Sequence, residues 1–150
     1  MHLKYIECKA NAYQQMNHVR KCTNYLCTLT EIYDQLSQTQ QYAVAIDTLD
    51  YMFDAEGFGH WYFSDYAQIT MSVLQDLFRT AVTTIDNVEA IRVIYTVERV
   101  IEQSRWLLKD KQEDNLDLAT AKALAEIQLE YRKLRPQFIT VMKQWFEAQA

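Results

Sequence analysis

Residues that break regular structure are scarce in this chain, whose 150 residues include only two glycines and one proline. A β-sheet needs tight turns, and tight turns draw on residues that accept a positive φ or have a fixed φ. Three such residues cannot serve the many turns of a sheet. The sequence therefore predicts an all-α fold.

Apolar residues recur at alternating three- and four-residue steps, which is typical of amphipathic helices packed in a bundle. The steps predict a single helical-bundle domain over residues 1–150, built from about five helices. These are expected from about Lys9 to Leu36, from Ser37 to Gly57, from Asp65 to Ile85, from Asp86 to Leu108, and after the polar connection 109–115.

Capping patterns support several of these boundaries. Ser37 followed by Gln40 has the spacing of a capping box. We also expect Asp65 with Gln68, and Asp86 with Glu89, to act as capping pairs. The apolar stripes expected to face the core include Tyr42, Ile46, Leu49 and Phe53 in the second helix and Ala67, Met71, Leu74, Phe78 and Ala81 in the third.

The first and last helices are expected to be the long walls of the bundle, each about 40 Å at 1.5 Å per residue. The apolar stripe of the last helix passes through Pro136 without losing its phase. A proline inside a helix removes one backbone hydrogen bond and bends the helix. We therefore predict one long helix with a kink near Pro136.

Composition narrows the class of protein. The longest apolar runs are far shorter than the roughly 20 residues that span a bilayer, and no secretory h-region is visible, so no membrane partner is expected. The three cysteines are an odd number without a C-x-x-C pair, which favours a reducing, cytoplasmic compartment. No metal or cofactor is expected.

Charge is distributed unevenly along the chain, whose net charge is −5. Residues 22–78 contain eight carboxylates and no lysine or arginine. At about 100° per residue, Asp47, Asp50 and Asp54 fall on one helix face, to the side of the apolar stripe. We expect this face to point into solvent, where it would attract a basic partner and repel nucleic acid.

The segment from Gly57 to Tyr66 holds five aromatic residues and His60. Its rings could fold back as a lid over one end of the bundle, with the glycines allowing a sharp reversal. They could instead stay exposed as anchors for a partner, since aromatic residues dominate interface hot spots. We expect a mixture, with some of the rings buried and His60, Trp61 or Tyr62 at the surface.

Two catalytic alternatives rest on short patterns. His18 and Lys21 have the His-x-x-Lys spacing that resembles histidine-phosphotransfer domains, although Cys22 stands where those domains place a small residue. The acidic pairs Glu31/Asp34 and Asp47/Asp50 loosely resemble the motifs of all-α NTP pyrophosphohydrolases, which bind Mg²⁺ through carboxylates. No lysine or arginine lies near these pairs in the sequence to receive a triphosphate.

The sequence thus predicts a non-enzymatic protein-interaction module, acting as a regulator, inhibitor or adaptor. Its partner would offer a basic surface, and the module could mimic nucleic acid in the partner's binding groove. A homodimer is an additional expectation, because five apolar stripes can exceed what one bundle buries. The expected partner-binding residues are Asp47, Asp50, Asp54, Glu56, Phe58, His60, Trp61, Tyr62 and Asp65.

Overall fold

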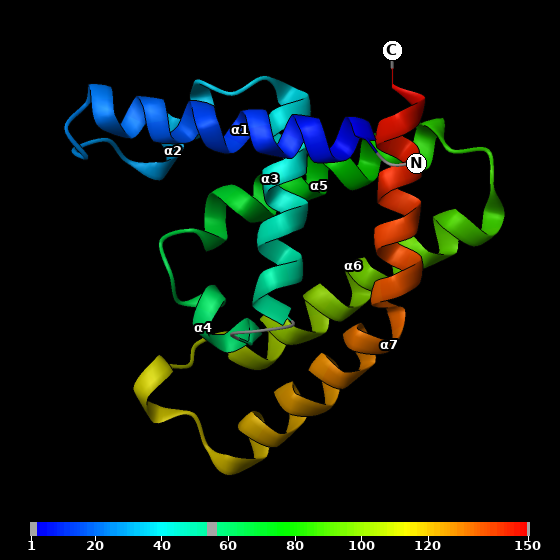
Figure 1. Cartoon of the computed structure of the whole chain (residues 1–150). Helices are drawn as coiled ribbons and strands as arrows, with labels where there is room; N and C mark the ends of the chain where they lie inside the picture. The colour runs from blue at the N-terminus through cyan, green and yellow to red at the C-terminus, as the bar shows by residue number, and fades with distance from the viewer. Residues whose placement is uncertain (1–2, 54–56, 150) are drawn as a thin grey trace.

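The computed structural model describes residues 3–53 and 57–149, and no strand occurs in these ranges (Figure 1). The described residues form seven α-helices and one 3₁₀ turn. In chain order these are α1 Leu3–Cys22, α2 Leu29–Asp34, α3 Gln38–Tyr51, α4 Phe58–Tyr62, α5 Ala67–Thr84, α6 Val88–Leu108, η2 Glu113–Asn115 and α7 Leu118–Ala148. Five of them are longer than six residues, so the expected helical bundle of about five helices is confirmed.

The longest helix, α7, runs for 31 residues and contains Pro136, as predicted. It bends along its length and lies beside α6 in its first half and near α1 at its end (Figure 1). Its last turns meet the start of α1, where the backbone N–H of Lys4 donates to Glu147 Oε1 at 2.6 Å. The Lys4 ammonium donates in turn to the backbone carbonyls of Glu147 and Gln149.

Large aromatic side chains fill the centre of the fold. Phe53, Trp61, Tyr131 and Phe138 are all fully buried. The Phe53 ring lies 4.7 Å from that of Tyr131, a spacing at which aromatic pairs attract beyond simple burial. The stripes expected in the second and third helices are buried as predicted, so helical phase placed the core of α3 and α5 correctly.

The expected first helix, from Lys9 to Leu36, is wrong as one element. Helix α1 ends at Cys22, and Asn24 and Tyr25 then adopt positive φ values of 53° and 61°. The amide of Tyr25 donates to the carbonyl of Arg20, and that of Asn24 to the carbonyl of Lys21. This pair of hydrogen bonds is a Schellman motif with asparagine in the left-handed position. The 20-residue α1 is therefore about 30 Å long instead of 40 Å.

The predicted caps have mixed outcomes. Ser37 and Gln40 form the expected capping box at the start of α3. Helix α5 begins after Tyr66 without a side-chain cap, so the pair Asp65 and Gln68 is wrong. The cap of α6 is Asn87, one residue after the expected Asp86. The polar connection after α6 is exposed as predicted, and it contains η2.

No helix among the described residues is both long enough and apolar enough to cross a membrane.

Candidate partner-binding groove

The prediction that an acidic face of α3 points into solvent is wrong, because two of the aspartates of this face are paired with other residues of the protein. Asp47 accepts hydrogen bonds from the Tyr13 hydroxyl at 2.5 Å and from the Lys9 ammonium at 3.3 Å. Asp50 is four-fifths buried at its side chain and binds Arg135. Asp54 and Glu56 lie outside the described residues.

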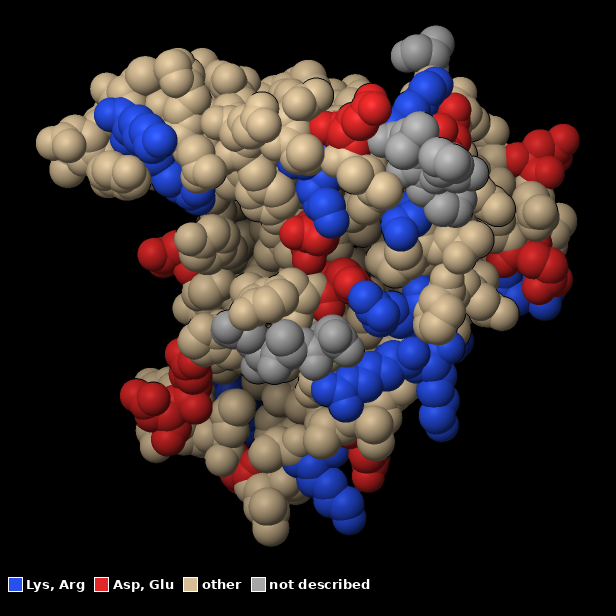
Figure 2. All heavy atoms as spheres, in the orientation of Figure 1, with Lys and Arg blue, Asp and Glu red and all other residues tan. Residues whose placement is uncertain are grey.

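Asp50 is held by α7 through three hydrogen bonds. Nε of Arg135 donates to Asp50 Oδ1 at 2.6 Å, Nη2 of Arg135 donates to Oδ2 at 2.9 Å, and the Tyr131 hydroxyl donates to Oδ1 at 2.9 Å. A two-pronged pair of this kind is among the strongest polar contacts in proteins. Figure 2 accordingly shows acidic and basic side chains interleaved on the face in view, with no continuous acidic sheet.

The aromatic segment also differs from the expected mixture. Phe58 and Trp61 belong to the short helix α4 and are buried, so neither can serve as a surface anchor. The prediction that these two residues contact a partner is therefore wrong. Tyr62 is half-buried and packs against Phe63 with ring centroids 5.0 Å apart. The lid interpretation therefore holds for the two buried rings.

Three of the expected site residues in this segment keep accessible surface. His60 is exposed, with its Nδ1 3.3 Å from Glu113 Oε1. Asp65 is exposed and Tyr62 is half-buried. A part for these three residues in partner binding stays a prediction.

The catalytic alternatives gain little from the geometry. His18 and Cys22 approach each other on the exposed side of α1, with Sγ 3.4 Å from Nε2. No group of three or more histidine, cysteine or acidic side chains in the described ranges could hold a metal ion. Asp50, one of the four carboxylates of the hydrolase alternative, is already bound by Arg135. The geometry therefore gives the hydrolase alternative no support.

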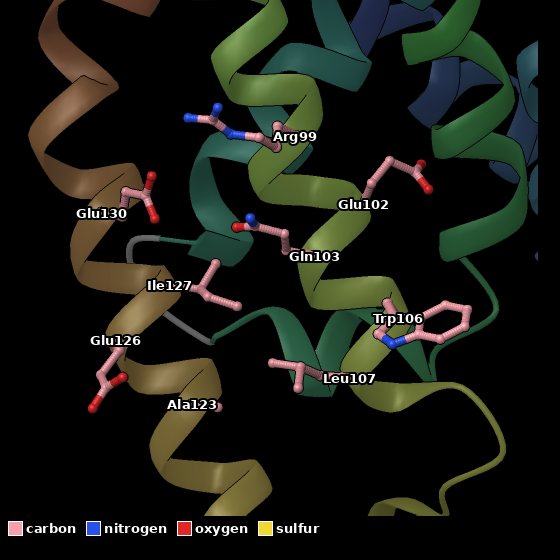
Figure 3. A pocket seen from close by; sticks show the side chains of 9 residues that line it. All are labelled: Arg99, Glu102, Gln103, Trp106, Leu107, Ala123, Glu126, Ile127 and Glu130. Atoms are coloured by element: carbon pink, nitrogen blue, oxygen red, sulfur yellow. The ribbon is translucent and has the colours of Figure 1, made fainter.

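A shallow groove of about 680 Å³ lies between α6 and α7 (Figure 3). We call it the α6–α7 groove. In Figure 3, Leu107 points from α6 toward α7, Ile127 points from α7 toward α6, and Trp106 stands on the other flank of α6. The lining residues are Arg99, Glu102, Gln103, Trp106, Leu107, Ala123, Glu126, Ile127 and Glu130.

Trp106 is the most conspicuous side chain of the groove, because it is 73% exposed. The Lys109 ammonium lies 5.2 Å from the centroid of its ring, in a cation–π contact. The half-buried Leu107, Ala123 and Ile127 form an apolar floor on the α7 side of α6, and Trp106 stands at the edge of the groove on the other flank of α6. A large exposed ring next to a concave apolar floor is typical of a protein-binding surface.

The exposed face of α6 continues beyond the groove. A second hollow lies along the same helix, is lined by Val88 and Tyr95 among others, and shares Arg99 with the groove. Val88 and Tyr95 are 71% and 55% exposed, and they are seven residues apart. Trp106 follows eleven residues later, so all three lie on one helix face at about 100° per residue. This face is opposite the buried side of α6.

The rim of the groove is mainly acidic. Glu126 and Glu130 lie four residues apart on α7, and neither has an ion pair among the described residues. Like charges at this spacing destabilise a helix by a few tenths of a kcal/mol. Glu102 contributes a third carboxylate, which pairs with Arg105 at 2.8 Å. Against these three acids, Arg99 is the one cation that lines the groove.

The sequence pattern did not predict this groove, although it contains one signal of it. Trp106 lies off the apolar stripe that runs through Ile101 and Leu108. A tryptophan on the polar side of an amphipathic helix has no place in the core. That position could have marked α6 as a helix with a second, outward function.

No protein-family model matches this chain, and no significant similarity connects it to a curated protein or to a solved structure. The function must therefore be inferred from the described surfaces.

Proposed function

We propose that this chain is a non-enzymatic, cytoplasmic protein-interaction module that binds an amphipathic helix of its partner in the α6–α7 groove. The partner helix would place an apolar stripe on the floor of the groove and basic residues against its rim. The basic partner expected from the sequence is thus retained, while the binding surface moves from α3 to α6 and α7.

The exposed Trp106 ring beside an apolar floor is the observation that carries this proposal. Helix-in-groove recognition uses apolar anchors at steps of three, four and seven residues. Partner residues spaced in this way could contact Leu107 and Ile127 with one stripe and cover Trp106 with the next. Trp106 would then act as a hot spot, whose loss in an interface typically costs about 2 kcal/mol or more, roughly 30-fold in Kd.

Charge complementarity favours a basic partner over an acidic one. Bringing a lysine or arginine next to Glu126 and Glu130 would relieve their mutual repulsion, while an acidic helix would add to it. Because these carboxylates are at the rim, they are expected to contribute mainly to the association rate and to its salt dependence.

The proposal is tested with a displayed library of 18-residue helical peptides, selected against the full chain. We expect enrichment of peptides that combine an apolar stripe with flanking lysine or arginine. Trp106→Ala should weaken the selected peptides about 30-fold, and Glu126→Lys with Glu130→Lys should also weaken them and flatten the salt dependence. Leu118→Ala is the matched control, since Leu118 is 86% exposed and lies outside the groove.

Trp106 is exposed, so its replacement should leave the melting temperature within a degree or two of the parent. A loss of binding can then be assigned to the surface. Selected peptides that are acidic, or that bind Trp106→Ala as well as the parent, would show the proposal to be wrong. Self-association abolished by Trp106→Ala would assign the face to a homodimer instead.

A further inference from the structure

A third hollow, of about 310 Å³, is lined by the arm formed by α1 and α2, by α3 and by Tyr66. Tyrosines from four places in the chain line it, so we call it the tyrosine pocket. They are Tyr13 on α1, Tyr33 on α2, Tyr51 on α3 and Tyr66 just before α5. Its volume is at the lower end of the range found for small-molecule sites, which often lie between the helices of bundles.

The exposure of the four tyrosine rings increases from the floor of the pocket to its mouth. Tyr33 is buried, Tyr13 is half-buried, and Tyr51 and Tyr66 are about half exposed. Burial raises the pKa of Tyr33, and burial together with the hydrogen bond to Asp47 raises that of Tyr13. These phenols therefore stay neutral at physiological pH. They offer ring faces to a ligand and carry no charge of their own, while the Tyr13 hydroxyl donates to Asp47.

Two opposite charges line the same pocket. Asp47 comes from α3 and Arg20 from the last turns of α1. Asp47 binds the Lys9 ammonium only at 3.3 Å, with both side chains about one-third exposed, so a ligand ammonium could compete for it. The guanidinium of Arg20 has no carboxylate partner among the described residues, and its one side-chain contact is Asn17 Oδ1 at 3.4 Å.

We infer that the tyrosine pocket binds a small aromatic zwitterion, a molecule of the amino-acid type. Its ammonium would lie against Asp47 and the tyrosine faces, its carboxylate against Arg20, and its ring among the tyrosines. A simple cation would meet repulsion from Arg20, and a simple anion would meet repulsion from Asp47. A ligand that carries both charges uses both groups, and cation–π attraction adds to its binding.

The test compares three probes that share one aromatic body: L-phenylalanine, phenethylamine and 3-phenylpropionate. Binding to the full chain is measured by calorimetry and by the shift in melting temperature. We expect phenylalanine to bind at least tenfold more tightly than either of the singly charged analogues. Equal affinities of the three probes, or no binding of phenylalanine at millimolar concentration, would overturn the inference.

Two variants assign the charges separately. Arg20→Gln should weaken phenylalanine about tenfold and should not weaken phenethylamine, which loses only a repulsive charge. Asp47→Asn should weaken phenylalanine and phenethylamine but not 3-phenylpropionate. Lys21→Gln on α1 and Asp34→Asn on α2 are the charge-matched controls, since both residues are exposed and do not line the pocket.

Arg20→Gln keeps the test decisive if Asp47→Asn disturbs the fold, because Arg20 has no ion pair to lose within residues 3–53 and 57–149. Equal weakening of the amine and the acid by Arg20→Gln would refute the assigned orientation. The pocket shares no lining residue with the α6–α7 groove, so the two proposals can fail independently.

Discussion

The substitution Asp50→Ala distinguishes two orientations of the Asp50 side chain. The sequence predicts that this side chain faces solvent, whereas in the structure it is bound by residues of α7. If the side chain faced solvent, as helical phase predicts, its loss would change the free energy of unfolding by less than about 0.5 kcal/mol. In the structure the carboxylate accepts three hydrogen bonds from Arg135 and Tyr131, which join residues more than 80 positions apart. Its loss should then weaken the attachment of α3 to α7.

Hydrogen bonds to charged groups contribute about 1.5–3 kcal/mol in favourable cases. Arg135 is 43% exposed at its side chain and can turn back into water, so the lower part of that range applies. We expect Asp50→Ala to lower the free energy of unfolding by about 2 kcal/mol. For a chain of this length that corresponds to a fall in melting temperature of roughly 4–8 °C.

The measurement is urea unfolding followed by circular dichroism, with Asp34→Ala as the control. Asp34 is an exposed acid on α2, and its side chain makes no hydrogen bond or ion pair in the described part of the chain. A double-mutant cycle with Arg135→Gln should give a coupling energy of about 1 kcal/mol or more. If Asp50→Ala is no more harmful than Asp34→Ala, the inward orientation of Asp50 is refuted.

Three further predictions concern local features. Gly57 has a φ of 83°, so Gly57→Ala should destabilise the protein by about 1–3 kcal/mol. Gly59 lies within α4, so Gly59→Ala should stabilise the protein slightly. Equal effects of the two substitutions on urea unfolding would contradict this prediction. Ser37→Ala removes the capping box of α3 and should cost about 1 kcal/mol, read as a lower melting temperature. The hydrogen bond from Tyr42 lowers the pKa of Asp76. Ionised Asp76 therefore stabilises the fold at any pH above the ordinary pKa of an aspartate. This stabilisation is lost as the pH falls through the lowered pKa of the folded state. Asp76→Asn should consequently be less stable at pH 7 and lose less stability than the parent between about pH 5 and pH 2, as measured by melting curves.

The long helices were predictable because their apolar stripes are regular. Helix α7 kept its phase through Pro136, and the stripes of α3 and α5 proved to be buried. The break after α1 was missed because no glycine or proline marks it. Asn24 was the available signal, since asparagine also adopts the left-handed conformation that ends a helix. Thr28, which caps α2 by accepting from the amide of Glu31, was a second signal.

The candidate sites were less predictable because they depend on which helices become neighbours. Phase placed Asp47 and Asp50 correctly at the border of the apolar stripe. A side chain at the border of the stripe can face solvent or a neighbouring helix. Which of the two it faces depends on residues far away in the sequence. Lys9 and Arg135 supply the partners here, from α1 and α7. The pattern within one helix cannot reveal such pairs.

The hydrogen bonds between Lys4 and the last turn of α7 bring the start of α1 next to the end of α7, so the path of the chain is an almost closed ring. A short peptide bridge from Gln149 to Lys4 would complete it. The ring could then be opened at the exposed turn around Asn24, between α1 and α2, without cutting a helix. In such a circular permutant α6 and α7 would stay continuous, and the rearranged chain would carry its new ends on the arm, next to the tyrosine pocket.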